Sequence, residues 1–221
     1  MSSIPSQKIL ALLNDSKLEL DGIQFSEEMI DRFQEFCALL QKWNEKINLT
    51  SEKNALSILE KHVFDSLHYL RWLDSSHKTI DIGSGGGFPG IPVKIIQPDL
   101  NLTLMESQRK RCNFLREAIR SLKLGGVEVV EGRAESFSSL EPFSEQFDRV
   151  LFRGFSSFDS CLAVGLPFLK PGGIIILKKG PDEMPDSTNE SLHNALIIDS
   201  KEVDGLAGQS SLMMVIEKCS T

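Results

Sequence analysis

Apolar residues at helical spacing dominate the first third of the chain. From residue 29 to residue 43 they recur every three or four positions, and Ser26 followed by two glutamates marks the start of this helix. The pattern breaks at residues 48–51 and resumes through residues 58–73. We therefore expect residues 1–75 to form a helical N-terminal extension.

From residue 76 onward, short β-branched runs alternate with helical stretches. This alternation predicts a mainly parallel sheet with helices on both faces. The predicted parallel strands are residues 79–82, 101–105, 127–130, 147–152 and 174–177. Two later runs, 195–198 and 211–217, predict a terminal antiparallel pair. The expected fold of residues 76–221 is thus α/β and Rossmann-like.

The connecting segments of this second region carry their own signals. The predicted helices are residues 89–96, 108–122 and 158–169. The last of these is expected to stop at Pro171-Gly172-Gly173, because proline and glycine interrupt helices. The polar segment 179–190 is expected to be a loop, mobile or folded over a ligand site.

Composition excludes several classes of protein. The chain of 221 residues is 41% hydrophobic and 25% charged, and its net charge is −7. No apolar run approaches the roughly 20 residues that span a bilayer. The four cysteines lie far apart, without the spacing of a zinc site or a disulfide framework. We expect a cytoplasmic, monomeric protein without a membrane segment or a metal.

The first strand of the second region runs into a loop with five glycines in eight residues, 83–90. In a doubly wound sheet this loop faces the ligand, and glycine lets a ligand approach the backbone closely. Three of the glycines match the dinucleotide pattern G-x-G-x-x-G, which alone is weak evidence. Asp81 before the loop and Pro89 within it favour S-adenosylmethionine, whose methionine end a carboxylate can meet. The alternative is a tight turn without a ligand.

Two further segments complete the expected cofactor pocket. Glu106 ends the second strand, where an acid accepts hydrogen bonds from ribose hydroxyls. Nicotinamide and S-adenosylmethionine enzymes share this chemistry, so Glu106 does not distinguish them. After the third strand, backbone groups of Ala134 and Glu135 are expected beside the adenine. The alternatives are an exposed acid and a solvated charged loop.

These segments together resemble the RsmG (GidB) family of 16S ribosomal RNA guanine-N7 methyltransferases. The resemblance runs along nearly the whole chain and is carried by residues 43–50, 62–66, 81–92, 110–115, 147–148, 153–155 and 177–180. It implies a class I methyltransferase fold, S-adenosyl-L-methionine as cofactor, and transfer to a guanine in the decoding region (530 loop), in naked RNA or a 30S particle. The expected cofactor-binding residues are Asp81, Gly83, Gly85, Phe88, Glu106, Ala134, Glu135 and Arg153.

The expected reaction requires few catalytic groups from the protein. Guanine N7 carries an exposed lone pair, so its attack needs in-line placement and no base. The chain lacks the Pro-Cys nucleophile of pyrimidine carbon-5 methylation and the [DN]-P-P-[FY] loop used for exocyclic amines. Arg153 and Lys179 are the predicted catalytic residues, with Arg153 on the cofactor carboxylate or on guanine O6. A surface arginine paired with Glu135 or Asp148 is the alternative.

RNA contact requires a basic face, although the chain as a whole is acidic. The predicted RNA-binding residues are Asn48, His62, Arg109, Lys110, Arg111 and Lys178. The N-terminal extension adds Lys42, Lys46, Lys53 and Lys61. His62, Asp65 and Ser66 share one helical face and either line the cleft or form a structural cluster. A solvated helix face is the alternative for the basic residues.

Other functions stay open at this point. A nicotinamide-dependent oxidoreductase would use the same glycines, but no Tyr-x-x-x-Lys motif is present and the only tyrosine, Tyr69, precedes the first strand. A methyltransferase acting on another RNA or on a small molecule, and a cofactor-free RNA-binding module, are further alternatives.

Overall fold

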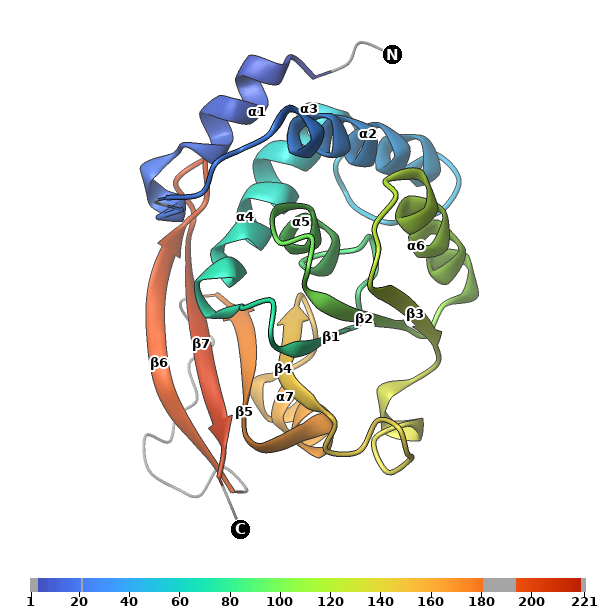
Figure 1. The fold of residues 1–221 in the computed structure, drawn as a ribbon, viewed down its shortest axis with the longest axis vertical. Helices are drawn as coiled ribbons and strands as arrows, with labels where there is room; N and C mark the ends of the chain where they lie inside the picture. The colour runs from blue at the N-terminus through green and yellow to red at the C-terminus, as the bar shows by residue number, and fades with distance from the viewer. Residues whose placement is uncertain (1–3, 21, 181–193, 220–221) are drawn as a thin grey trace.

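A computed structural model describes residues 4–20, 22–180 and 194–219. The strands are β1 (Lys78–Ile82), β2 (Asn101–Glu106), β3 (Val127–Glu131), β4 (Phe147–Arg153), β5 (Leu169–Lys179), β6 (Ala195–Asp204) and β7 (Ser210–Lys218). In the described part of the chain they form one sheet in the order β3-β2-β1-β4-β5-β7-β6 (Figure 1). β1 to β5 are parallel, whereas β7 is antiparallel to both β5 and β6. The predicted parallel sheet with a terminal antiparallel pair is confirmed.

The N-terminal region is helical, as the spacing of its apolar residues predicts. Its α-helices are α1 (Ser6–Leu13), α2 (Glu27–Asn44), α3 (Ala55–Ile58) and α4 (Phe64–Leu67). The Ser26 hydroxyl caps α2 by accepting a hydrogen bond from the Met29 N–H at 3.2 Å. The single helix expected after residue 58 is instead interrupted. A π-helical segment, Leu59–Val63, joins α3 to α4, and a 3-10 turn, His68–Trp72, follows.

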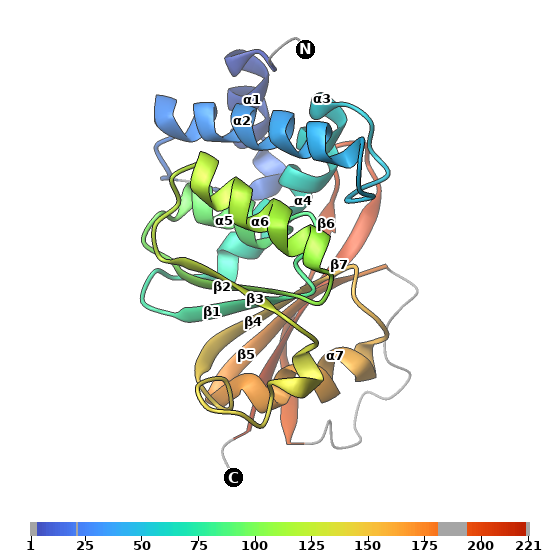
Figure 2. The same cartoon turned by 90° about the vertical axis from the view of Figure 1, so that its right-hand side faces the viewer.

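The helices cover the two faces of the sheet unequally. The remaining α-helices are α5 (Gly90–Ile96), α6 (Arg109–Ser121) and α7 (Phe158–Gly165). The N-terminal helices, α5 and α6 lie on one face, and α7 lies on the other (Figure 2). Residues of the N-terminal helices share one hydrophobic cluster with sheet residues such as Leu102 and Leu151. A division into two domains near residue 75 stays a prediction.

The connection between α7 and β5 differs from the prediction. The helix ends at Gly165 rather than near residue 169, and Pro171-Gly172-Gly173 lies inside β5 instead of in front of it. The pairing of β5 with β4 shifts register across this segment. A bulge of this kind tolerates proline and glycine because its residues leave the hydrogen-bond ladder.

Two further expectations concern a membrane-spanning helix and the segment 179–190. Within the described residues, the helices are too short or too polar to cross a bilayer. The segment 179–190, expected to be a loop near a ligand, lies outside the described residues except for Lys179 and Gly180.

Candidate functional site

Two acidic side chains from neighbouring strands hold the glycine-rich loop in place. Asp81 of β1 accepts a hydrogen bond from the Gly90 N–H at 3.0 Å, and Glu106 of β2 accepts one from the Gly85 N–H at 3.0 Å. The loop is therefore fixed at both ends, at the carboxyl edge of the parallel strands. This edge is where doubly wound sheets bind their ligands.

Asp81 lies beneath the loop rather than at its surface. Its side chain is fully buried, and burial raises the pKa of its carboxyl group to about 8. A Cβ on Gly90 would lie 2.8 Å from Oδ2 of Asp81 and 2.5 Å from Cδ2 of Leu104, so only glycine allows this approach. Oδ1 of Asp81 has no hydrogen-bond partner in the described part of the chain. Asp81 thus anchors the start of α5, and its expected contact with a cofactor stays a prediction.

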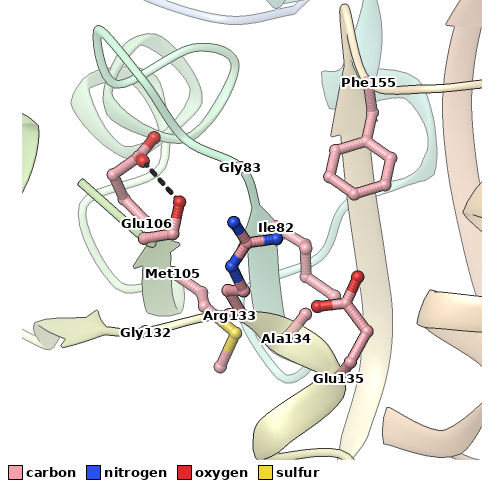
Figure 3. A pocket seen from close by; sticks show the side chains of 10 residues that line it. Ile82, Gly83, Met105, Glu106, Gly132, Arg133, Ala134, Glu135 and Phe155 are labelled. Atoms are coloured by element: carbon pink, nitrogen blue, oxygen red, sulfur yellow. Dashed lines mark hydrogen bonds between the residues drawn. The ribbon is translucent and has the colours of Figure 1, made fainter.

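A hollow of about 140 Å³ opens beside the loop, at the ends of β1, β2 and β3 (Figure 3). Four of the residues expected to bind the cofactor line it, namely Gly83, Glu106, Ala134 and Glu135. Its apolar walls include Met105 and Phe155. The Phe155 ring would lie only 3.1 Å from a Cβ on Gly83, where φ is +77°, so glycine is required there as well.

Glu106 presents a carboxylate that is already oriented. Its side chain is only 5% exposed, Oε1 accepts from the Gln108 N–H at 2.8 Å, and Oε2 accepts from Gly85. Nη1 of Arg111 lies 3.8 Å from Oε2. Oε1 also accepts a longer hydrogen bond from the Ser107 hydroxyl at 3.4 Å, and a rotatable hydroxyl can give way to a ligand. Glu106 can therefore accept hydrogen bonds from a diol.

A second group of side chains meets on the other side of the glycine loop. Nη2 of Arg153 lies 3.0 Å from Nδ1 of His62 and 3.2 Å from Oδ2 of Asp65. Nζ of Lys178 lies 2.8 Å from the same Oδ2, and the Arg153 guanidinium lies 5.4 Å from the Phe88 ring centre. We call these five residues the Arg153 cluster. Two cations share one carboxylate, so the cluster carries a net positive charge.

His62 enters this cluster as an uncharged acceptor. Burial, with a smaller effect from the Arg153 cation, lowers its pKa to about 4. Since Arg153 donates to Nδ1, Nε2 carries the proton and donates to Oγ1 of Thr50. Arg153 pairs with Asp65, so the alternative of a surface arginine paired with Glu135 or Asp148 is wrong.

Thr50 is held by a residue that sequence reasoning missed. The Asn44 side chain donates to the carbonyl oxygens of Thr50 and Glu52 at 2.9 Å each, and it accepts from the N–H groups of Leu49 and Thr50. Asn44 is a buried polar residue at the end of α2, and a single amide organises the turn that follows. An asparagine at a helix end was the only signal of this role in the sequence.

The two lysines that end β5 point to opposite faces, because side chains alternate along a strand. Lys178 joins the Arg153 cluster, and burial lowers its pKa. The Lys179 ammonium instead donates to the carbonyl oxygen of Ser156. The structure therefore places Lys178, expected to bind RNA, in the Arg153 cluster, and Lys179 against the carbonyl oxygen of Ser156. The catalytic role expected of Lys179 stays a prediction.

The basic helix α6 is less positive than its composition suggests. Arg116 pairs with Glu131 at 3.1 Å, and Arg120 pairs with Glu117 at 2.7 Å. For these two arginines the solvated and paired helix face is the better description. Their charges are largely compensated within the chain.

Three other basic residues lie at the N-terminal end of α6. Arg109 and Lys110 are exposed and form no ion pair within the described ranges. Arg111 lies over the glycine loop, where it donates to the Asn48 carbonyl oxygen at 3.3 Å and approaches Glu106. Arg111 thus connects the turn after α2 to the hollow beside β2.

Comparison with known proteins gives this geometry a context. The model of the rRNA small subunit methyltransferase G family, GidB, matches residues 29–208. The chain belongs to the GidB family. Ribosomal RNA small subunit methyltransferase G of Geobacter sp. (strain M21) is 40% identical over 174 residues, which cover 79% of each protein. The protein of the same name from Alkaliphilus metalliredigens is 35% identical over 214 residues, covering 94% of this chain and 89% of that protein.

Solved structures share the fold of this GidB-family chain at low sequence identity. M. jannaschii TYW2 in complex with AdoMet has a TM-score of 0.55 and 17% identity, covering 71% of this chain and 76% of that chain. A SAM-dependent methyltransferase from Aquifex aeolicus has a TM-score of 0.54 and 14% identity, covering 82% and 98%. The fold is therefore that of the class I methyltransferases, as predicted.

Proposed function

We propose that the chain binds S-adenosylmethionine and transfers its methyl group to N7 of a guanine in the decoding region of 16S ribosomal RNA. The observation that carries this proposal is the arrangement around the glycine loop. A hollow with a buried, oriented carboxylate lies on one side, and the Arg153 cluster lies on the other. Membership of the GidB family selects the reaction class for this pair of sites.

The residues present fit this cofactor. Glu106 offers two oriented acceptors for ribose hydroxyls, and the backbone at Ala134 and Glu135 borders the hollow where an adenine would lie. The apolar side chains of Met105 and Phe155 provide walls for a ring. Bound there, the cofactor supplies a methyl group that its sulfonium already activates.

The Arg153 cluster supports a role for this chain in positioning its ligands. Arg153 lies on the cluster side of the glycine loop, and its guanidinium can hold a carboxylate or donate to the guanine O6 beside N7. Lys178 provides a second donor in the same place. Attack by N7 requires no base, and His62, with a pKa of about 4 and its Nδ1 already accepting from Arg153, is a weak base. The protein then contributes in two ways: it places the guanine N7 in line with the methyl group, and it excludes water.

The proposal includes where the reaction takes place and with which partner. The acceptor is small-subunit RNA, either naked or in the 30S particle, and the enzyme acts in the cytoplasm as a monomer. The exposed Arg109 and Lys110 at the start of α6 supply positive charge next to the site.

Mass mapping tests the proposed function. Incubation of 30S particles lacking N7-methylguanosine with the protein and S-adenosylmethionine should add one methyl group to a decoding-region guanine. Arg153→Ala should reduce this transfer by at least a hundredfold, whereas Lys8→Ala on α1, far along the chain from the site, should leave it unchanged. Methylation of another nucleotide, or binding of NADH in place of S-adenosylmethionine, would contradict the proposal.

A further inference from the structure

A surface groove between α2 and α6 lies outside the site described above. Its cavity has a volume of about 300 Å³ and is lined by Leu39, Lys42, Trp43, Lys46 and Glu117. The two helices lie side by side on the same face of the sheet (Figure 2). We call this cavity the Trp43 groove.

An aromatic ring held by the core forms part of the groove. The Trp43 ring packs edge-on against Phe114 of α6, with 5.9 Å between ring centres and an interplanar angle of 65°. Trp43 is nevertheless partly exposed and lines the cavity. A ring that is fixed on one side and accessible on the other loses little conformational entropy when a flat partner stacks on it.

Positive charge flanks this ring. Lys42 and Lys46 are both exposed, and in the described part of the chain neither forms an ion pair. The acid that lines the groove, Glu117, is paired with Arg120 at 2.7 Å, so its charge is compensated. The groove therefore combines an aromatic platform with two available cations, which is the combination that binds single-stranded nucleic acid.

The turn that follows α2 links the residues of the groove to the candidate site. Lys46 lies in this turn, the carbonyl oxygen of Asn48 accepts from Arg111, and Thr50 contacts His62 of the Arg153 cluster. Arg111 in turn approaches Glu106 beside the hollow. A strand of RNA leaving the site along this turn would meet the lysines of the groove next.

We propose that the Trp43 groove binds one nucleotide of single-stranded RNA flanking the target guanine. The base stacks on the Trp43 ring, and the phosphates on either side pair with Lys42 and Lys46. The inference rests on the proposed function for the identity of the RNA. Stacking of this kind tolerates every base, because every base has a π face. The groove therefore contributes affinity and register rather than sequence selection.

Fluorescence provides a direct test, because the chain has only two tryptophans. Trp72 lies elsewhere in the fold, where its Nε1 donates to Asp199 of β6. In a Trp72→Phe variant Trp43 is the only indole, and titration with a short single-stranded oligoadenylate should quench its emission in a saturable, salt-sensitive way. In the matched Trp43→Phe variant, the emission of Trp72 should stay unchanged. Unchanged Trp43 emission at RNA concentrations that saturate binding by anisotropy would overturn the proposal.

Kinetics provide the second test. The double variant Lys42→Glu and Lys46→Glu should raise the KM for RNA at least tenfold, while kcat and the affinity for S-adenosylmethionine stay unchanged. Lys8→Glu and Lys123→Glu, which carry the same charge change on other exposed lysines, serve as controls. An unchanged KM in the double variant, or quenching of Trp43 by an acidic peptide and not by RNA, would overturn the proposal.

These readouts separate the groove from the proposed function. Normal methylation of ribosomal RNA without quenching would reject the groove and leave the function standing. Quenching by RNA in a protein that methylates no ribosomal RNA would reject the function and leave the groove as an RNA-binding surface.

Discussion

Arg153 donates a hydrogen bond to Nδ1 of His62 at 3.0 Å, and this contact joins the N-terminal helices to the carboxyl end of β4. The two residues lie 91 positions apart in the sequence. His62 belongs to the π-helical segment Leu59–Val63, and π-helical turns often occur at functional sites. The N-terminal extension therefore supplies part of the candidate site and does not merely cover the sheet.

The first test of the Arg153 cluster removes the charge of Asp65, whose carboxylate Arg153 and Lys178 share. Asp65→Asn leaves Arg153 and Lys178, whose side chains are 16% and 9% exposed, without their counter-charge. We expect the free energy of unfolding to fall by about 3 kcal/mol, because an uncompensated buried charge is strongly destabilising. Urea denaturation at pH 7 measures the change.

Two controls locate the origin of this loss. Adding Lys178→Met to Asp65→Asn removes one of the two cations and should restore part of the stability, which a double-mutant cycle quantifies. Glu145→Gln breaks the ion pair of an acid that is 57% exposed, with Lys218, and should cost less than about 1 kcal/mol. Equal losses for Asp65→Asn and Glu145→Gln would show that Asp65 does not compensate two poorly exposed cations.

Glu106 is expected to determine cofactor affinity. Glu106→Gln replaces one acceptor oxygen with a donor, which cannot accept from the Gly85 N–H or from a ribose hydroxyl. Hydrogen bonds to a charged group contribute about 1.5–3 kcal/mol, so the Kd for S-adenosylmethionine should rise at least tenfold. Isothermal titration calorimetry gives the affinity, and thermal unfolding of the same samples reports any loss of folding.

The matched control for this variant lies one strand away. Glu131 of β3 is in register with Glu106 of β2, but it is 36% exposed and pairs with Arg116. Glu131→Gln should leave the Kd for S-adenosylmethionine within about twofold of wild type. A similar loss of affinity in both variants would show that the effect is one of general charge rather than of an oriented carboxylate.

A substitution at Gly90 tests how closely the glycine loop packs against Asp81. The Cβ of a Gly90→Ala variant would meet Cδ2 of Leu104 at 2.5 Å and Oδ2 of Asp81 at 2.8 Å. Overpacking of this kind costs about 1–3 kcal/mol, and urea denaturation should show a loss in that range. Gly125→Ala is the control, because its Cβ would have no neighbour within 4 Å and its φ is not positive. A loss in Gly125→Ala as large as that in Gly90→Ala would contradict the steric argument.

The sheet and the glycine loop could be predicted because their signals are local. β-branched runs such as Ile174–Leu177 define strands, and parallel topology then puts the loop after β1 at the same edge as the end of β2. Gly83 and Glu106 consequently line one hollow, as two separate sequence signals suggested. The interruption of the helix around His62 was not predictable, because a π-helical turn leaves the apolar pattern almost unchanged.

The partners of the charged residues could not be predicted, because they depend on contacts between distant segments. No local pattern in the sequence pairs Asp65 with Lys178, and the roles of Lys178 and Lys179 separate only when the face of β5 that packs on the N-terminal helices is known. The ion-pair partners of the basic helix α6 could not be predicted for the same reason. Its charge is read correctly from the sequence, but the pairing of Arg116 with Glu131 across α6 and β3 is tertiary.

The pH dependence of stability should report on two histidines, the half-buried His62 and the buried His68. Burial lowers the pKa values of His62 and His68 to about 4, whereas histidine in an unfolded chain titrates near about 6.5. Between these values the unfolded chain binds protons that the folded chain does not. The stability that the neutral histidines contribute is complete above about pH 6.5 and is lost as the pH falls toward about 4.

Asp81 changes the stability with pH in the opposite direction, so the effect of the histidines must be measured against a variant that keeps Asp81. Its pKa is raised to about 8, and the stability that its protonated form contributes is lost as the pH rises toward that value. The double variant His62→Gln and His68→Gln keeps Asp81 and removes only the histidine effect. Between pH 7 and pH 5, wild type should lose about 3 kcal/mol more than this variant in urea denaturation. Parallel losses in the two proteins would mean that neither imidazole is held neutral by burial.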